Sequence, residues 1–262
     1  MHRQVSEMLQ RAYRPYPSLP ELLGAFVKEL AQHKAMRGGE VQLHGDMAGM
    51  AAGMPLPAKH AERGRSHRVP IRYAGEVLGE LHLEGECGPL DGSALVLGEQ
   101  FAQRCAHLIK RYEAKAWAEQ ALRRPLLLVG AGEALKQIEE FIERAAASRL
   151  PVLLRGEFGT EKMELAAALH SGGHARQGPF VEVNCAHPAG EPDDWFAHAQ
   201  GGTLYFHEVD ELPAILQGQL SHRIRGLHAT RSEAEAIRPI RVIASTSADL
   251  EQRVREKQFS RA

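Results

Sequence analysis

The stretch GEFGTEKM, residues 156–163, has residue types and a spacing that could hold phosphate. In the phosphate-binding pattern G-x-x-x-x-G-K-[ST], backbone N–H groups of a glycine-rich turn and a lysine hold the phosphates of a nucleotide, and the hydroxyl residue holds magnesium. The stretch keeps Gly156 and Lys162, but it has Glu161 for the second glycine and Met163 for the hydroxyl residue. On these residues alone, a nucleotide site and an ordinary strand-to-helix turn both stay open.

The elements predicted around this stretch place it at the end of a strand. The apolar run PVLLR (151–155) predicts a strand before it, and a helix is expected over 161–171 after it. Further strands are predicted over 179–185, 202–208 and 240–246, with helices over 133–148 and 213–227 and a charged helix at the end of the chain. Continuous apolar strands separated by helices predict a parallel sheet covered on both faces, so this half of the chain is expected to be α/β.

The order of the segments in this half carries a resemblance to a known family. The chain contains, in this order, PVLLRGEFGTEKMELAAALHSGGHARQGPFVEVNCA, GGTLYFHEVDELP, LQGQLSHRIRG and IRVIASTSADLEQRVREKQFSR. From about Leu126 to Arg261 it resembles the AAA+ domain of the sigma-54-dependent transcriptional activators, also called bacterial enhancer-binding proteins. The resemblance implies a P-loop αβα sandwich over 123–262 and a role in transcription control.

The nucleotide site that the resemblance implies departs from the family pattern at several points. In the family's terms, Glu208 matches the residue that polarises water, His207 replaces the aspartate that orders Mg²⁺, and Ser247 replaces the asparagine that senses the γ-phosphate. Imidazole is a poor Mg²⁺ ligand, while the carboxylate of Glu161 would repel phosphates and its Cβ would oppose backbone angles that suit glycine. The implied degenerate site comprises Gly156, Glu157, Gly159, Thr160, Glu161, Lys162, Met163, His207 and Ser247, with Glu208 as a vestigial catalytic residue.

Two segments of the family pattern are not matched in this sequence. The family places the loop that engages sigma-54 between Cys185 and Gly201, where this chain has a shorter segment. The chain also ends at Ala262, where the family continues into a fifth strand, a helical lid and a DNA-binding helix-turn-helix. The resemblance therefore implies a truncated domain without direct DNA binding. Its strand over 151–155 is expected to lie at the sheet edge, covered by another segment or by a partner chain.

The first half of the chain is expected to form a separate domain over 1–122. The predicted elements are a helix over 18–33, a strand over 41–45, a loop over 46–68, a hairpin over 68–85 that turns at Ala74-Gly75, and a long helix over 91–122. The hairpin and the helix that follows resemble the C-terminal half of a GAF domain, which implies a GAF-like α+β sensory domain. We expect the long helix to pair with its copy in a homodimer; packing on the sheet is the alternative.

Composition limits the remaining classes of function. The chain has 262 residues, of which 44% are hydrophobic and 25% are charged, which is typical of a globular protein. Because its net charge is −1, binding to nucleic acid or anionic lipid that is dominated by electrostatic attraction is not expected. No apolar run approaches the ~20 residues that span a bilayer, and the start of the sequence has no signal-peptide core, which predicts a cytoplasmic protein. The three dispersed cysteines predict reduced thiols.

No metal site is expected, because the fourteen histidines show no ligand spacing. Two alternatives stay open at this point. One is a redox-sensing Cys87 near His82. The other is a soft-metal loop that would use His44, Met47, Met50, Met54 and His60.

Three hypotheses about function follow. The first is a non-hydrolysing regulatory protein that needs no cofactor and binds another protein, either a full-length enhancer-binding protein or a second copy of itself. The second is a weak ATPase that binds ATP and Mg²⁺ through Lys162 and hydrolyses with Glu208. The third is a decayed gene product that retains the fold. The residues Glu161, His207 and Ser247 favour the first or the third over the second.

Overall fold

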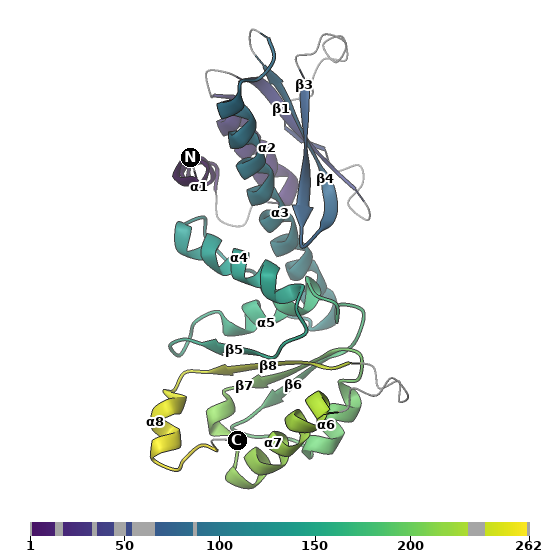
Figure 1. Ribbon diagram of the computed structural model, residues 1–262, viewed down its shortest axis with the longest axis vertical. Coiled ribbons are helices and arrows are strands. Elements are labelled where there is room, and N and C mark those ends of the chain that lie inside the picture. The colour runs from purple at the N-terminus through teal and green to yellow at the C-terminus, as the bar shows by residue number, and fades with distance from the viewer. Residues whose placement is uncertain are drawn as a thin grey trace. The chain divides into compact units, whose positions relative to one another are not determined.

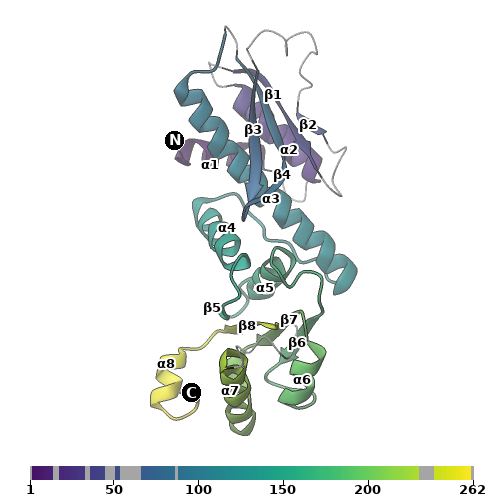
Figure 2. The same ribbon diagram turned by 45° about the vertical axis from the view of Figure 1, so that its right-hand side comes forward.

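The chain forms two compact units. The computed structural model, drawn in Figure 1 and Figure 2, describes residues 2–13, 18–32, 36–44, 51–53, 66–85, 88–229 and 239–260. One unit consists of Met1–Ala116 and Leu127–Glu143, and the other of Trp117–Leu126 and Arg144–Ala262. This division differs from a single boundary at 122/123, because the segment 127–143 folds with the first unit.

An antiparallel four-stranded sheet lies at the centre of the first unit. Its order is β2-β1-β4-β3, with β1 over Met36–Leu43, β2 over Ala51–Gly53, β3 over Ser66–Tyr73 and β4 over Glu76–Gly85. The predicted hairpin is confirmed as β3 and β4, with positive φ at Ala74 (48°) and Gly75 (87°) in its turn. The predicted loop over 46–68 is wrong at β2, because the short AAG segment becomes a strand only by pairing with β1.

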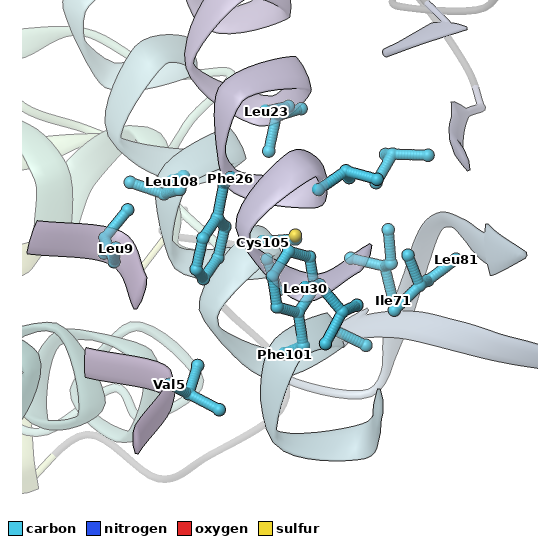
Figure 3. Close-up of a cluster of buried hydrophobic side chains, with 14 of the residues drawn as sticks. Val5, Leu9, Leu23, Phe26, Leu30, Ile71, Leu81, Phe101, Cys105 and Leu108 are labelled. Carbon is cyan, nitrogen blue, oxygen red and sulfur yellow. The ribbon is translucent and has the colours of Figure 1, made fainter. Parts of the chain in front are cut away.

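Three helices share one hydrophobic core with this sheet: α1 (His2–Ala12), α2 (Leu19–Ala31) and α3 (Gly92–Ala121). The helix α2 begins after Ser18, whose backbone N–H and hydroxyl both donate to Glu21. The rings of Phe26 and Phe101 stack with their centroids 3.8 Å apart, at the centre of the cluster drawn in Figure 3. The helix α1 was not predicted; it places Val5, Met8, Leu9 and Ala12 in this core.

Helix α3 is enclosed along its middle by the first unit, to which its residues 92–116 belong. Residues 101–111 are buried, apart from the half-buried Gln103. This part of α3 therefore packs within its own chain, which was the alternative to pairing with a copy. Self-pairing of α3 stays a prediction, and so does the GAF-like character of the unit.

A parallel four-stranded sheet organises the second unit, as predicted. The order is β5-β8-β7-β6, with β5 over Val152–Arg155, β6 over Phe180–Asn184, β7 over Thr203–His207 and β8 over Arg241–Thr246. Among the described strands, β5 pairs with β8 alone, so it lies at the sheet edge as expected. Its helix α5 (Lys162–Ser171) lies on one side of the sheet, and α6 (Pro192–His198) and α7 (Ala214–Ala229) lie on the other (Figure 1, Figure 2).

The remaining elements are short, apart from α4. They are α4 (Glu133–Ala146), the 3₁₀ turn η3 (Val209–Glu211) and α8 (Leu250–Arg255). The short segment between Cys185 and Gly201, for which no helix was predicted, contains α6. Glu191 and Asp194 form a capping box there and Pro192 occupies the first turn, a local signal that predicts a helix start. In the described part of the chain, no helix has both the length and the apolar composition that crossing a membrane requires.

Two of the three cysteines, Cys105 and Cys185, lie within the described residues. Cys105 and Cys185 are free and buried, and burial raises the pKa of the Cys105 thiol and brings the pKa of Cys185 to about 12. Both are therefore protonated, unreactive thiols at neutral pH. The residues Cys87, Met47, Met50, Met54 and His60 lie outside the described residues.

Candidate nucleotide-binding site

Three turns at one end of the parallel sheet bring the predicted site residues together. The loop 156–161 joins β5 to α5, His207 ends β7, and Ser247 follows the last residue of β8. Because β5, β8 and β7 are adjacent and parallel, their carboxyl ends share one edge. Open α/β sheets bind ligands at this edge. Residues that are about 90 positions apart in the sequence, from 156 to 247, therefore form a single polar cluster.

Lys162, the first residue of α5, is the centre of this cluster. Its side chain is 6% exposed, and its Nζ donates to the carbonyl oxygens of Gly156 at 3.2 Å and Glu157 at 2.9 Å and to Oγ of Ser247 at 2.9 Å. The Oε1 atom of Glu208 lies 3.2 Å from the same Nζ. An ammonium group has three protons to donate. The chain's own oxygens therefore satisfy the lysine completely and neutralise its charge.

Glu208 is held in place from several directions. Its Oε2 accepts from the backbone N–H of Ser247 at 2.7 Å, and its own backbone N–H donates to Oγ of Ser245 at 3.2 Å. Burial alone would raise the pKa of the carboxyl, but the hydrogen bonds from Ser247 and Lys162 outweigh burial and keep the pKa below its usual value. Glu208 is therefore a carboxylate at neutral pH. Its φ of 53° is unusual for a residue with a side chain, and the cluster holds it in that conformation.

The glycine-rich loop keeps its turn, but one expectation about Glu161 is wrong. Gly159 has φ +79°, and a Cβ at Gly156 would come within 2.9 Å of the Thr160 hydroxyl oxygen. That hydroxyl donates to the carbonyl oxygen of Glu157 at 2.8 Å. At Glu161 the backbone has φ −70°, which any residue adopts, so the expected conflict with its Cβ is absent. Its exposed carboxylate beside the start of α5 remains the electrostatic obstacle to phosphate.

The acidic side chains that follow β7 are bound to other parts of the second unit. Oδ1 of the buried Asp210 accepts from the Thr246 hydroxyl, and its Oδ2 lies 3.2 Å from Nη2 of Arg253. Glu211 also pairs with Arg253, at 3.2 Å. His207 lies edge-on to Tyr205, with ring centroids 6.2 Å apart. In the part of the chain that the structure describes, no three His, Cys, Asp or Glu residues gather as a metal site.

A cavity of about 640 Å³ opens beside the loop, with Phe158, Asn184, His207, Glu208, Ser247 and Arg253 among its lining residues. Phe158, at the tip of the loop, is 89% exposed. The sequence reasoning missed Phe158 and Arg253. An aromatic residue in a glycine-rich turn was a signal for the first. The second had no signal, because its role depends on the packing of α8 against η3. Met163 is half-buried in the first turn of α5 and supplies no hydroxyl group there.

Comparison with known proteins identifies similar sequences over the second half of the chain. The family model described as "Sigma-54 interaction domain" matches residues 129–262. The Nif-specific regulatory protein of Rhodobacter capsulatus is 33% identical over 154 residues, which cover 50% of this chain and 27% of that protein. The transcriptional regulator VasH of Vibrio cholerae is 31% identical over 173 residues, covering 58% of this chain and 32% of its own length. The matched region is thus about a third or less of these relatives.

Solved structures also resemble the chain, at low overall superposition. NtrX from Brucella abortus in complex with ATP is 26% identical with a TM-score of 0.45, covering 61% of this chain and 42% of that one. The P-loop NTPase domain of a sigma-54 transport activator from E. coli is 26% identical with a TM-score of 0.39, covering 48% of this chain and 96% of that one.

Proposed function

The chain belongs to the sigma-54 interaction domain family, and from this membership we propose that it is a non-hydrolysing regulatory protein of transcription that acts by binding another protein. Two relatives with similar sequences are named a Nif-specific regulatory protein and a transcriptional regulator. The proposed partner is a full-length enhancer-binding protein or a second copy of this chain.

The observation that carries the proposal is the internal ion pair of Lys162. In a phosphate-binding loop, this lysine must reach the terminal phosphates of the nucleotide. Here its Nζ is bound to Glu208, Ser247 and two loop carbonyl groups. A nucleotide would have to break these contacts and bring its phosphates next to the carboxylates of Glu208 and Glu161, at a cost in electrostatic repulsion.

The same cluster does not fit a bound Mg²⁺–ATP complex. Mg²⁺ requires oxygen ligands in octahedral geometry, whereas the residue at the end of β7 is His207 and the nearby Asp210 is held by Thr246 and Arg253. The hydroxyl of Ser247 is occupied as the acceptor for Lys162. These features support loss of hydrolysis and argue against the weak ATPase.

The surface around the loop supports a role in protein contact. An almost fully exposed phenylalanine, Phe158, stands at the loop tip, between the exposed carboxylates of Glu157 and Glu161. Aromatic side chains are enriched at the centres of protein interfaces. On the edge strand, Leu153 is 46% exposed, and Leu150 just before it is 69% exposed. Both features suit a protein partner better than a nucleotide.

Titration calorimetry with ATP and Mg²⁺, combined with an assay of phosphate release, tests the proposal. We expect no heat of binding at micromolar nucleotide and no phosphate release above the rate of a Lys162→Ala control. Micromolar binding with turnover that Lys162→Ala abolishes would instead establish the ATPase. Capture of a full-length enhancer-binding protein on this chain, lost in Phe158→Ser, would support the proposed type of partner.

A further inference from the structure

A cavity of about 210 Å³ lies at the amino ends of the parallel strands of the second unit, at the edge of the sheet opposite to the candidate nucleotide-binding site. Its lining residues include Ser148 and Arg149 before β5, His174 before β6 and Arg241 at the start of β8, and we call it the amino-edge cavity. Its volume is about seven times that of a water molecule in the liquid, so it has room for a small ligand.

The chain segments around this cavity are basic. Among the described residues, those that meet at this edge contain arginine and histidine but no aspartate or glutamate, and they are 144–151, 171–179, 199–202 and 239–241. By contrast, acidic residues follow the strands at the opposite edge, namely Glu157, Glu161, Glu208, Asp210 and Glu211. The net charge of −1 therefore conceals a separation of charge across the sheet. A hollow lined by charges of one sign concentrates ions of the other sign, so the amino-edge cavity favours anions.

Arg149 is the charge in this lining that a ligand can reach. It is exposed, and its guanidinium group makes no hydrogen bond or ion pair with the residues that the structure describes. At the opposite edge of the sheet, Arg155 and Arg253 are both paired with carboxylates. Next to Arg149, Oγ of Ser148 accepts from the backbone N–H of Leu150 at 3.1 Å, which leaves its hydroxyl proton to be donated to a ligand.

Arg241 brings a second guanidinium group to the wall of the cavity, in a fixed position. It is 5% exposed, its Nη2 donates to the carbonyl oxygen of Ala145 at 2.6 Å, and its Nη1 donates to that of Ser148 at 2.8 Å. Its potential also reaches the buried His170, whose pKa is lowered by burial and, to a smaller extent, by the Arg241 charge. Because arginine stays protonated in proteins, the wall keeps this positive charge at any pH near neutrality.

Close packing between the segments before β5 and β6 gives the cavity its shape. Nε2 of His174 lies 2.9 Å from the carbonyl oxygen of Ala147 and must donate to it, because a carbonyl oxygen only accepts. One residue earlier, a Cβ at Gly173 would come within 2.7 Å of the carbonyl oxygen of Leu169 and 3.4 Å of Nη1 of Arg241, so glycine is required there. These contacts hold both segments against Arg241, and the cavity is therefore formed before any ligand arrives.

We propose that the amino-edge cavity binds a small molecule that carries a phosphate group. A phosphate monoester has a charge of about −1.5 to −2 at pH 7, which matches two guanidinium groups, whereas a carboxylate would balance only one. The planar fork of Arg149 suits the oxygens of a phosphate, and the Ser148 hydroxyl is a further donor beside it. A cavity of this size takes one such group and not an extended polyanion. The site lies outside the candidate nucleotide-binding site, and the inference does not depend on the proposed function.

NMR titration of the isotope-labelled full chain with inorganic phosphate, at constant ionic strength, tests the site. We expect the backbone amide signals of 148–150 and 173–175 to shift and saturate, while those of 156–162 stay in place. Arg149→Gln should weaken phosphate binding by about ten-fold or more, because a charge-assisted hydrogen bond is lost. Arg155→Gln is the matched control and should leave the affinity unchanged, since Arg155 is an exposed arginine at the other end of β5 and pairs with Glu251.

A response that does not saturate, or equal weakening by Arg149→Gln and Arg155→Gln, would reduce the cavity to a region of diffuse positive charge and overturn the proposal. Shifts confined to 156–162 would place the phosphate on the glycine-rich loop and overturn it as well. Further titrations identify the class of ligand. Glycerol phosphate should bind at least as tightly as inorganic phosphate, and acetate should not bind. Acetate that binds as tightly as phosphate, or duplex DNA that binds through Arg149 more tightly than glycerol phosphate, would show that the ligand class is wrong.

Discussion

At the scale of single residues, the candidate site is a group of charges that satisfy one another. Lys162 and Glu208 are 6% and 14% exposed, and Ser247 bonds to both of them through its hydroxyl and its backbone N–H. A mostly buried pair of this kind contributes little net stability, but removing one partner is costly because the other charge stays behind. The cluster is therefore best tested by removing a single charge.

Glu208→Gln should lower the free energy of unfolding of the second unit by about 1–3 kcal/mol, because it leaves the Lys162 ammonium with less compensation. Glu211→Gln is the control: its carboxylate is 49% exposed and pairs with Arg253 at the surface, so a change within about 0.5 kcal/mol is expected. Urea unfolding followed by tryptophan fluorescence measures both, since Trp117 and Trp195 both lie in the second unit. Equal effects of the two substitutions would contradict the buried ion pair.

At the scale of elements, a buried histidine joins α5 to the parallel sheet. His170 is fully buried, its Nδ1 lies 2.8 Å from the Thr203 hydroxyl, and its ring lies 4.5 Å from that of Trp117 and 5.3 Å from that of Phe180. Burial, with a smaller contribution from the Arg241 charge, lowers the pKa of His170 to about 4. The histidine is therefore neutral in the folded unit.

The lowered pKa predicts a pH dependence with a definite sign. The unfolded chain binds a proton at His170 below about pH 6.5, whereas the folded unit binds it only near pH 4. Stability should therefore fall as pH drops from about 6.5 to 4, by up to about 3 kcal/mol. We expect His170→Phe to remove most of this slope, and His222→Gln, at an exposed position, to keep it. Urea midpoints between pH 7 and 4 provide the measurement; the same slope in His170→Phe would refute this role.

At the scale of the whole molecule, the chain forms two units with separate cores, and the second unit has an open sheet edge. The edge strand β5 pairs only with β8 among the described strands, and Leu153 on it is 46% exposed. An exposed apolar edge is a template for pairing with another chain. The net charge of −1 offers little repulsion between copies, so the composition does not oppose association.

We predict that the chain associates with itself through this edge. Sedimentation velocity between about 5 and 200 µM should show a concentration-dependent shift to larger species, with the association constant reduced by about ten-fold or more in Leu153→Lys, because a charge on an edge strand opposes pairing. Ile215→Lys is the control, since Ile215 is 75% exposed but lies on α7. A monomer across the whole range, or equal effects of both lysines, would show that this edge does not pair.

The sequence by itself determined the elements with strong periodicity and the order of the candidate site residues along the chain. The parallel strands, the hairpin at Ala74-Gly75 and the loop before Lys162 follow from local patterns, and the ordered segments identified the family. Local pattern missed both β2 and α6. It missed β2 because three small residues carry no strand signal without β1, and it missed α6 because its capping box was not weighed.

Only the tertiary structure decided which contacts the candidate site residues and the buried charged residues make. The sequence placed Lys162, Glu208 and Ser247 in one site, but the ion pair that neutralises the lysine depends on distances between three different turns. It also placed α4 with the second half of the chain. The charges of Glu139, Arg104 and Arg111 became one buried cluster only when α3 and α4 packed together. Charges have no periodic signal that marks their partners, because pairing in space depends on packing between elements that are distant in the sequence.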